Sequence, residues 1–308
     1  MKEFLEQFHT RHYQWSDFFL FTMLLCMLLT EMGQLIGSLL VTLPMRAVTD
    51  PFWVMFGDYF SFIGIWIAVI FAMNVIQRNR PMLKTLGPAM RNNRISYLLL
   101  GLLIGFLMNG LCILAAWLNK DIALSFAGFQ PLPLLLLLFA VFVQSSAEEL
   151  TERCYGYYRI TRGYKSWFFA ILINSLVFAI EHMMNPGVSF LPLLEIFLTG
   201  IFFGLCVRYF DSLWLPFGIH TMWNYTQNII FGLPNSGLVS TYSIFTLDAA
   251  NARQSFAYGP SFGIEGTLLS TGLHILACLI TWYFGRKRKS QPYDPWMDLE
   301  LQKSTASA

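Results

Sequence analysis

The chain has 308 residues, of which 56% are hydrophobic, 17% aromatic and only 12% charged, with a formal net charge of +2. A soluble protein of this size normally needs about a quarter of its residues charged to cover its surface, so an ordinary soluble domain is excluded. The small net charge and the lack of an arginine-rich arm also exclude a disordered, collagen-like or nucleic-acid-binding protein. The composition therefore predicts a membrane protein.

Helices that cross the bilayer are expected along most of the chain. Spanning the hydrocarbon core takes about 20 apolar residues in a helix, because the backbone amides must be satisfied within the segment. Eight segments qualify, at 16–44, 52–77, 95–118, 131–160, 166–185, 190–210, 213–231 and 266–285. The sequence thus predicts an all-α polytopic membrane protein of about eight transmembrane helices, forming a single domain over residues 1–308.

The basic residues predict how these helices are oriented. If the N-terminus is cytoplasmic, all but three of the 20 Lys and Arg residues lie on the cytoplasmic side, and the exceptions are Arg46, Lys120 and Arg253. This asymmetry requires an even number of spans, so both termini are expected in the cytoplasm. The connection 232–265 is expected to be an outer loop, and 291–308 a flexible cytoplasmic tail.

Ionisable side chains inside the predicted spans are the first candidates for a functional site. Each is costly in lipid unless it is paired or faces a cavity. They are Glu31, Glu148, Glu149, Glu181, His182, Glu195, His220 and His274. Most of them fall in the fourth to seventh spans, where Asn224 follows His220. The sequence therefore places the candidate site among these helices.

Two neighbouring carboxylates in the fourth span stand in unequal positions. Glu149 and Arg153 are spaced i and i+4, with the acid N-terminal to the base, which favours an ion pair. Glu148 lies about 100° around the helix without that partner, although Glu152 at i+4 would repel it. A charged carboxylate beside one with a raised pKa is the arrangement that general-base chemistry requires. Alternatively, the motif is a structural ion pair that helps the helix to pack.

The fifth and seventh spans carry the other polar candidates. Phe178 and His182 share a helix face, so the ring can shield the imidazole from lipid. His220 and Asn224 are also spaced i and i+4, and both can donate hydrogen bonds to an anionic oxygen. The alternatives are a packed interfacial histidine in the fifth span and interhelical hydrogen bonding in the seventh.

Taken together, three elements resemble the three motifs of the CPBP family, the CAAX proteases and bacteriocin-processing enzymes, also called the Abi family. They are Glu148-Glu149-x-x-x-Arg153, Phe178-x-x-x-His182 and His220-x-x-x-Asn224. The resemblance covers about residues 140–230, which are therefore expected to be the catalytic core. The histidine-rich second motif of the eukaryotic branch is absent, so the sequence is more similar to the bacterial branch. This similarity implies a multi-pass protein of the bacterial plasma membrane.

The resemblance implies an intramembrane endopeptidase of eight helices. In the family's glutamate mechanism, Glu148 would act as general base on a water that His182 helps to hold. His220 and Asn224 would stabilise the oxyanion of the tetrahedral intermediate. The implied partners are a membrane-associated peptide or protein substrate and the lipid bilayer, with no nucleic acid.

Glu149 and Arg153 are implied to support the first carboxylate. The sequence departs from the family pattern at two places beside them, where Glu152 replaces a commonly apolar residue and Cys154 replaces a glycine. These changes put catalytic efficiency and substrate shape in question more than the chemistry.

Three other functions remain compatible with these residues. A zinc-dependent intramembrane protease would use the same histidines and glutamates, but the sequence has no H-E-x-x-H pair and no C-x-x-C pair, so no metal or cofactor is expected. A non-catalytic bacteriocin-immunity or regulatory membrane protein could keep the constellation for packing or peptide binding. A proton-coupled transporter is disfavoured by the absence of inverted repeats.

Overall fold

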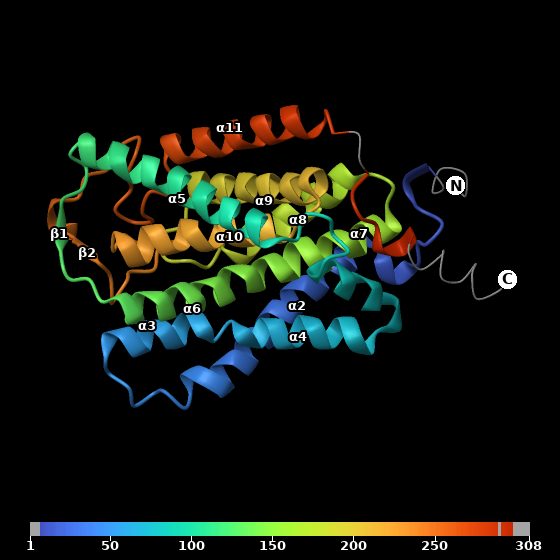
Figure 1. Cartoon of the computed structure of the whole chain (residues 1–308), viewed down its shortest axis with the longest axis horizontal. Coiled ribbons are helices and arrows are strands. Elements are labelled where there is room, and N and C mark those ends of the chain that lie inside the picture. The colour runs from blue at the N-terminus through green and yellow to red at the C-terminus, as the bar shows by residue number, and fades with distance from the viewer. Residues whose placement is uncertain (1–6, 289–290, 298–308) are drawn as a thin grey trace.

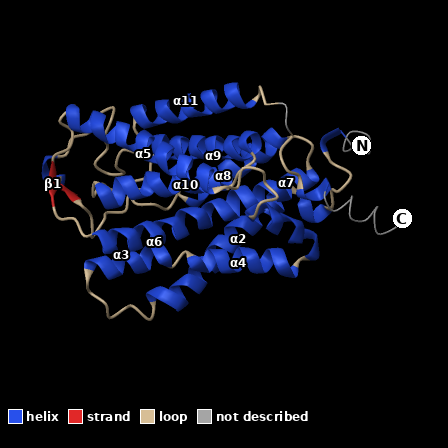
Figure 2. Cartoon of the chain, in the orientation of Figure 1, coloured by secondary structure: helices blue, strands red, loops and turns tan. Residues whose placement is uncertain are grey.

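The helices of the protein run mostly along one axis and form a bundle (Figure 1). The computed structural model describes residues 7–288 and 291–297. The α-helices of this part are α2 (Phe19–Gly37), α3 (Pro51–Phe60), α4 (Ile63–Val75), α5 (Ile95–Leu118), α6 (Pro131–Glu149), α7 (Tyr157–Gly163), α8 (Trp167–Glu181), α9 (Phe190–Phe210), α10 (Trp214–Asn224) and α11 (Leu268–Gly285). Helix dominates the fold, and the two short strands lie at one end of the bundle (Figure 2).

Six of the described helical segments are long and apolar enough to cross a membrane. They are Phe19–Thr42, Pro51–Val75, Ile95–Leu118, Pro131–Gly163, Phe190–Phe210 and Leu268–Gly285. Their outward faces are apolar, since side chains such as Leu24, Phe71 and Leu103 are more than half exposed. In water such a surface would be unfavourable, and in lipid it is expected. The prediction of an all-α polytopic membrane protein is confirmed.

The two remaining predicted spans, 166–185 and 213–231, are helical but shorter. The first corresponds to α8, which has 15 residues, and the second to α10, which continues as a π-helical segment over Tyr225–Ile230 (η5). The number of spans and the cytoplasmic location of the termini stay predictions.

The second predicted span, 52–77, is interrupted. A turn at Ser61 and Phe62 separates α3 from α4 where α2 comes very close, since a Cβ on Gly37 would lie 1.7 Å from the Ser61 carbonyl oxygen. The fourth span is longer than expected, because α6 passes through a π-helical segment, Leu150–Gly156 (η4), into α7.

A small sheet, which the sequence did not indicate, joins the connection after α5 to the connection 232–265. Strand β1 (Leu124–Phe126) follows α5 and pairs antiparallel with β2 (Phe245–Leu247), which belongs to the connection 232–265. Leu124 is opposite Leu247 in the register. The sheet lies at the end of the bundle opposite α7 (Figure 1).

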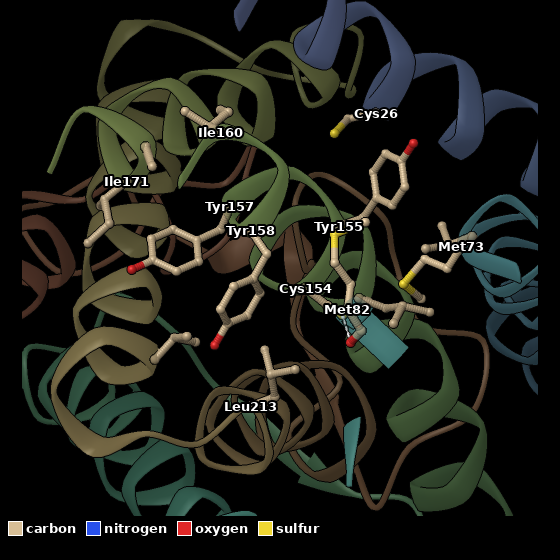
Figure 3. Close-up of a cluster of buried hydrophobic side chains, with 14 of the residues drawn as sticks. Cys26, Met73, Met82, Cys154, Tyr155, Tyr157, Tyr158, Ile160, Ile171 and Leu213 are labelled. Carbon is tan, nitrogen blue, oxygen red and sulfur yellow. Dashed lines mark hydrogen bonds between the residues drawn. The ribbon is translucent and has the colours of Figure 1, made fainter. Parts of the chain in front are cut away.

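The end of the bundle that contains α7 is filled by buried side chains. Tyr155, Cys154 and Leu213 are fully buried there and pack with Met82 and Met73 (Figure 3). These residues come from η4, the start of α10, the 3-10 segment Gln77–Leu86 (η3) and α4. The cluster therefore joins both halves of the chain and closes this end of the bundle.

Part of the expected C-terminal tail, 291–308, also packs at this end. Trp296 is buried, with the Arg162 guanidinium 5.0 Å from its ring centroid, and the Tyr293 amide donates to Asp211. Residues 298–308 lie outside the described part of the chain.

Glycines bring α5 and α10 close together. A Cβ on Gly101 would lie 2.3 Å from the Leu215 carbonyl oxygen, and one on Gly218 would lie 2.4 Å from that of Leu98. Such close backbone contact needs small residues, as is common between helices in membranes. This contact determines where α10 presents His220 to the interior of the bundle.

Candidate functional site

A cavity of about 340 Å³ lies inside the bundle. Its wall is formed by α2, α3, α6, α8, α9, α10, α11 and the connection 232–265. Eight Asp, Glu and His side chains line it, namely Asp58, Glu148, Glu181, His182, Glu195, His220, Glu265 and His274. The predicted residues Glu148, His182, His220 and Asn224 all lie on this wall, although they come from three different helices.

Glu148 presents one carboxylate oxygen that makes no hydrogen bond. Its Oε1 accepts a hydrogen bond of 2.6 Å from Gln144 Nε2, one helical turn earlier. Its Oε2 is buried without a hydrogen-bond partner in the described chain and lies 3.6 Å from His220 Nε2. A carboxylate with one oxygen in a hydrogen bond and the other without one is suited to accept a proton from a bound water.

Glu149 contacts Nδ1 of the His220 ring, whereas Glu148 lies near Nε2 of the same ring. Glu149 Oε2 pairs with Arg153 Nε at 3.1 Å, as the i,i+4 spacing predicts. Its Oε1 accepts a hydrogen bond of 3.0 Å from His220 Nδ1. The pair therefore orients the imidazole of α10, whereas the sequence suggested that it supports the first carboxylate.

Arg153 is fully buried next to two aromatic rings. Its guanidinium carbon lies 4.4 Å from the ring centroid of Phe178 and 5.4 Å from that of Phe203. Both rings also contact His220, with centroid distances of 6.1 and 5.6 Å. The terminal nitrogens of Arg153 have no hydrogen-bond partners among the described residues. The cation–π contacts with the two rings stabilise the buried charge instead.

His182 directly follows the last residue of α8, and a contact of its ring shows which nitrogen carries a proton. Its Nδ1 lies 2.7 Å from the Phe178 carbonyl oxygen, which can only accept, so Nδ1 carries the proton. In the neutral ring Nε2 is then an acceptor. The Phe178 ring packs edge-on against the imidazole, as the shared helix face predicts, with 4.7 Å between centroids. His182 is one of the residues that line the cavity.

Asn224 is held on both sides of its carboxamide. Its Nδ2 donates to Gln144 Oε1 at 3.0 Å and to Ser145 Oγ at 3.3 Å, and its Oδ1 accepts from Asn235 Nδ2 at 3.1 Å. Gln144 therefore contacts both Asn224 and Glu148 and links α10 to α6.

Glu152 repels Glu148, as the i+4 spacing predicts, although it does not line the cavity. It is buried against α8, where Asn174 Nδ2 donates to its Oε2. One oxygen of Glu152 is thus bonded to a neighbouring helix, while its Oε1 is buried without a hydrogen-bond partner among the described residues.

A second polar group on the cavity wall was not expected from the sequence. Glu265, from the connection before α11, accepts from Trp223 Nε1 at 2.9 Å and from the Ser236 hydroxyl at 3.0 Å. Burial raises the pKa of the Glu265 carboxyl, and the hydrogen bonds from Trp223 and Ser236 lower it in part. Nothing in the local sequence separates this glutamate from one in a solvated loop.

Glu195 and His274 form a further contact between α9 and α11. Glu195 Oε1 lies 3.5 Å from His274 Nδ1, and Ser270 donates to the same carboxylate. The sequence indicated both residues as costly in lipid, and only the fold shows that they meet.

Gln144 was not identified from the sequence, yet its substitution has a clear expected effect on the geometry of the site. Substitution by Leu keeps its approximate volume but removes the hydrogen bonds to Glu148 and Asn224. Because small displacements of groups at a reacting centre are costly, we expect kcat of the reaction at this site to fall by up to about a hundredfold. Steady-state kinetics of the purified Gln144→Leu variant measure this. An unchanged kcat, with an unchanged melting temperature, would show that Gln144 does not position the site.

The described residues offer no converging metal ligands. No group of three or more His, Cys, Asp or Glu side chains in residues 7–288 and 291–297 is arranged to hold a metal ion. The histidines instead direct their Nδ1 atoms to a carboxylate or to backbone carbonyls.

Comparison with known proteins identifies the segment that contains this site. Residues 130–226 match the family Rce1-like, described as Type II CAAX prenyl endopeptidase Rce1-like. The matched segment runs from the start of α6 into η5 and includes the three motifs noted in the sequence. The predicted family resemblance is confirmed over these residues. No curated protein and no solved structure matches the chain significantly.

Proposed function

We propose that this chain, whose residues 130–226 match the Rce1-like endopeptidases, is an intramembrane endopeptidase that uses Glu148 to activate water. The observation that carries the proposal is Glu148 on the cavity wall, whose Oε2 has no hydrogen-bond partner among the described residues and lies 3.6 Å from His220 Nε2. The neighbouring Glu149 is already engaged by Arg153 and His220. Two adjacent carboxylates thus have different environments, and only one is free to work as a base.

Glu148 takes a proton from the water while the water oxygen attacks the peptide carbonyl carbon. His182 holds the same water through Nε2, its acceptor nitrogen. The tetrahedral intermediate then collapses, the C–N bond breaks, and the proton on Glu148 passes to the leaving amine. Atoms and charge balance without any further reactant.

His220 and Asn224 stabilise the oxyanion. Asn224 Nδ2 makes two hydrogen bonds, and the longer one goes to Ser145 Oγ at 3.3 Å. The substrate oxygen replaces Ser145 Oγ as the acceptor of this bond. His220 donates from Nε2 while Glu149 accepts from Nδ1. A ring that donates from both nitrogens carries a positive charge, which offsets the charge of the oxyanion.

The bacterial setting belongs to the same proposal. The lack of the eukaryotic histidine-rich second motif supports a bacterial plasma-membrane enzyme, whose substrate is a membrane-associated peptide or protein such as a bacteriocin precursor. A small membrane or secreted peptide encoded beside this protein is the first substrate to test.

Peptide cleavage by the purified protein in liposomes tests the function. We expect new peptide termini by mass spectrometry, at a rate that a zinc chelator leaves unchanged, because the described site residues do not converge on a metal. Activity that is lost with chelator and restored by zinc would instead favour the metalloprotease. A protein with no cleavage of any candidate peptide, whose cellular effect survives the loss of Glu148, would favour an immunity or regulatory role.

A further inference from the structure

Three carboxamide side chains form a hydrogen-bonded chain along the cavity wall between two glutamates. At one end, Glu148 Oε1 accepts from Gln144 Nε2 at 2.6 Å, and Gln144 Oε1 accepts from Asn224 Nδ2 at 3.0 Å. Asn224 Oδ1 in turn accepts from Asn235 Nδ2 at 3.1 Å. The same nitrogen of Asn235 also donates to Glu265 Oε1 at 3.4 Å, where the chain ends. All five side chains line the same cavity.

The two carboxylates determine how the three amides between them are turned. A carboxylate oxygen only accepts hydrogen bonds, so Glu265 requires the nitrogen of Asn235. The two hydrogens of that nitrogen serve Glu265 and Asn224, which requires Asn224 to present its oxygen to Asn235. At the other end, Glu148 requires the nitrogen of Gln144, whose oxygen is then left to accept from Asn224. The hydrogen bonds thus link the orientation of the Asn224 carboxamide to Glu265.

Glu265 is buried and held in place, although it lies in an irregular connection. Its Oε1 accepts from Trp223 Nε1 at 2.9 Å. Its Oε2 accepts from the Ser236 amide and, at 3.0 Å, from the Ser236 hydroxyl. Trp223 directly precedes Asn224 on α10. The same carboxylate therefore contacts one residue of α10 directly and reaches the next one through Asn235.

Asn235 is presented to α10 by a tight turn of the connection before α11. The Asn235 and Leu238 amides each donate to the other residue's carbonyl oxygen, both at 2.9 Å. The two residues between them, Ser236 and Gly237, have φ values of 49° and 83°. Positive φ at both central positions is typical of a type I′ turn. A Cβ on Gly237 would collide with the Pro186 carbonyl oxygen, so the turn also packs closely against the segment after α8.

Asn235 and Glu265 lie outside the segment that matches the Rce1-like family, which ends at residue 226. The connection 232–265 thus adds polar side chains to a cavity whose proposed reacting groups come from the matched segment. Burying a carboxylate is costly, and an apolar residue would pack against Trp223 at lower cost. The presence of a buried glutamate at this place favours a role in orienting polar groups.

We propose that Glu265 and Asn235 are positioning residues, which hold the Asn224 carboxamide with its nitrogen toward the oxygen of the reacting peptide carbonyl. The proposal rests on the proposed endopeptidase function, in which Asn224 stabilises the oxyanion. A donor directed at the developing charge stabilises the transition state and not the bound substrate. Loss of this orientation therefore lowers kcat and leaves KM nearly unchanged.

Exchanging the amide of Asn235 for an acceptor of the same shape tests the orientation. Asn235→Asp places an oxygen where Nδ2 donates, so Asn224 turns its own nitrogen toward this oxygen and away from the substrate. We expect kcat for peptide cleavage in liposomes to fall by about 10- to 100-fold, with KM changed by less than about twofold. Asn251→Asp, the same exchange at an exposed position of the same connection, is the matched control and should cleave like the wild type.

Two substitutions of Glu265 separate its hydrogen bonds from its charge. The oxygen of Gln can still accept from Trp223 and Asn235, whereas Leu accepts from neither. We expect Glu265→Leu to lower kcat about as much as Asn235→Asp, and Glu265→Gln to keep kcat within about threefold of the wild type. Thermal unfolding of both variants shows that they are folded. Equal losses of kcat in the two variants, or wild-type kcat in folded Glu265→Leu, would overturn the proposal.

The Asn224→Ala background decides whether Asn235 acts through Asn224. We expect Asn224→Ala alone to lower kcat by about 100- to 1,000-fold, and the addition of Asn235→Asp to cause no further loss, because both substitutions remove the same donor. Losses that multiply would show a separate role for Asn235 and overturn the proposal. Wild-type cleavage by Asn224→Ala would instead overturn the oxyanion role in the proposed function. A loss in Asn224→Ala together with wild-type cleavage by Asn235→Asp would overturn the positioning role alone.

Discussion

Replacing Glu148 by Gln is expected to lower kcat for peptide cleavage by about two to four orders of magnitude, the usual contribution of a general base. Gln has nearly the same shape and can still accept from Gln144, so the hydrogen bond at Oε1 is retained. It cannot take a proton from water at the other position. The rate of product formation by the purified variant in liposomes measures the effect.

Glu31→Gln is the matched control for this substitution. Glu31 is an exposed glutamate of α2 and does not line the cavity, so removing its charge should leave kcat unchanged. Thermal unfolding of both variants shows that loss of activity is not loss of fold. Wild-type turnover by a folded Glu148→Gln protein would refute the proposed role of this residue.

Replacing Arg153 by Met is expected to lower the free energy of unfolding by about 3–5 kcal/mol, because it leaves a buried carboxylate without its partner. Arg153 and Glu149 are both fully buried and 3.1 Å apart. Met fills part of the space between Phe178 and Phe203 but carries no charge. Unfolding in detergent, followed by intrinsic tryptophan fluorescence, measures the change.

The double variant Glu149→Gln/Arg153→Met separates charge from packing. Neutralising Glu149 removes the uncompensated charge, so the double variant should be more stable than Arg153→Met alone. It should remain poorly active, because His220 loses the carboxylate that orients it. Arg46→Met, at an exposed arginine, serves as the control and should unfold like the wild type. Equal stability of the single and double variants would contradict a buried ion pair.

Much of the architecture could be predicted because membrane helices leave a strong local pattern. Long apolar segments locate the spans, and the Glu149–Arg153 pair follows directly from the i,i+4 spacing. The edge-on packing of Phe178 against His182 follows from the same periodicity. These features depend on neighbours along one helix, so one sequence contains the information.

The break between α3 and α4, the shorter α8 and the small sheet could not be predicted in this way. Each depends on a neighbouring element, such as the close approach of α2 at Gly37 or the pairing of β1 with β2. The contact of Gln144 with Glu148 could have been predicted, because Gln144 lies one turn before Glu148 on the same helix face. The place of Glu265 could not, since it lies in an irregular connection.

The sequence by itself determined the membrane class, the family resemblance and the motif residues of the candidate site. Only the tertiary structure decided that Glu149 contacts His220, that one oxygen of Glu148 has no hydrogen-bond partner among the described residues, and that Glu265 lines the same cavity. Helical spacing places residues on the faces of one helix, but contacts between helices depend on close packing, as between Gly101 and α10. Apolar side chains that face lipid and those that line a cavity have the same composition, so only their arrangement in space distinguishes them.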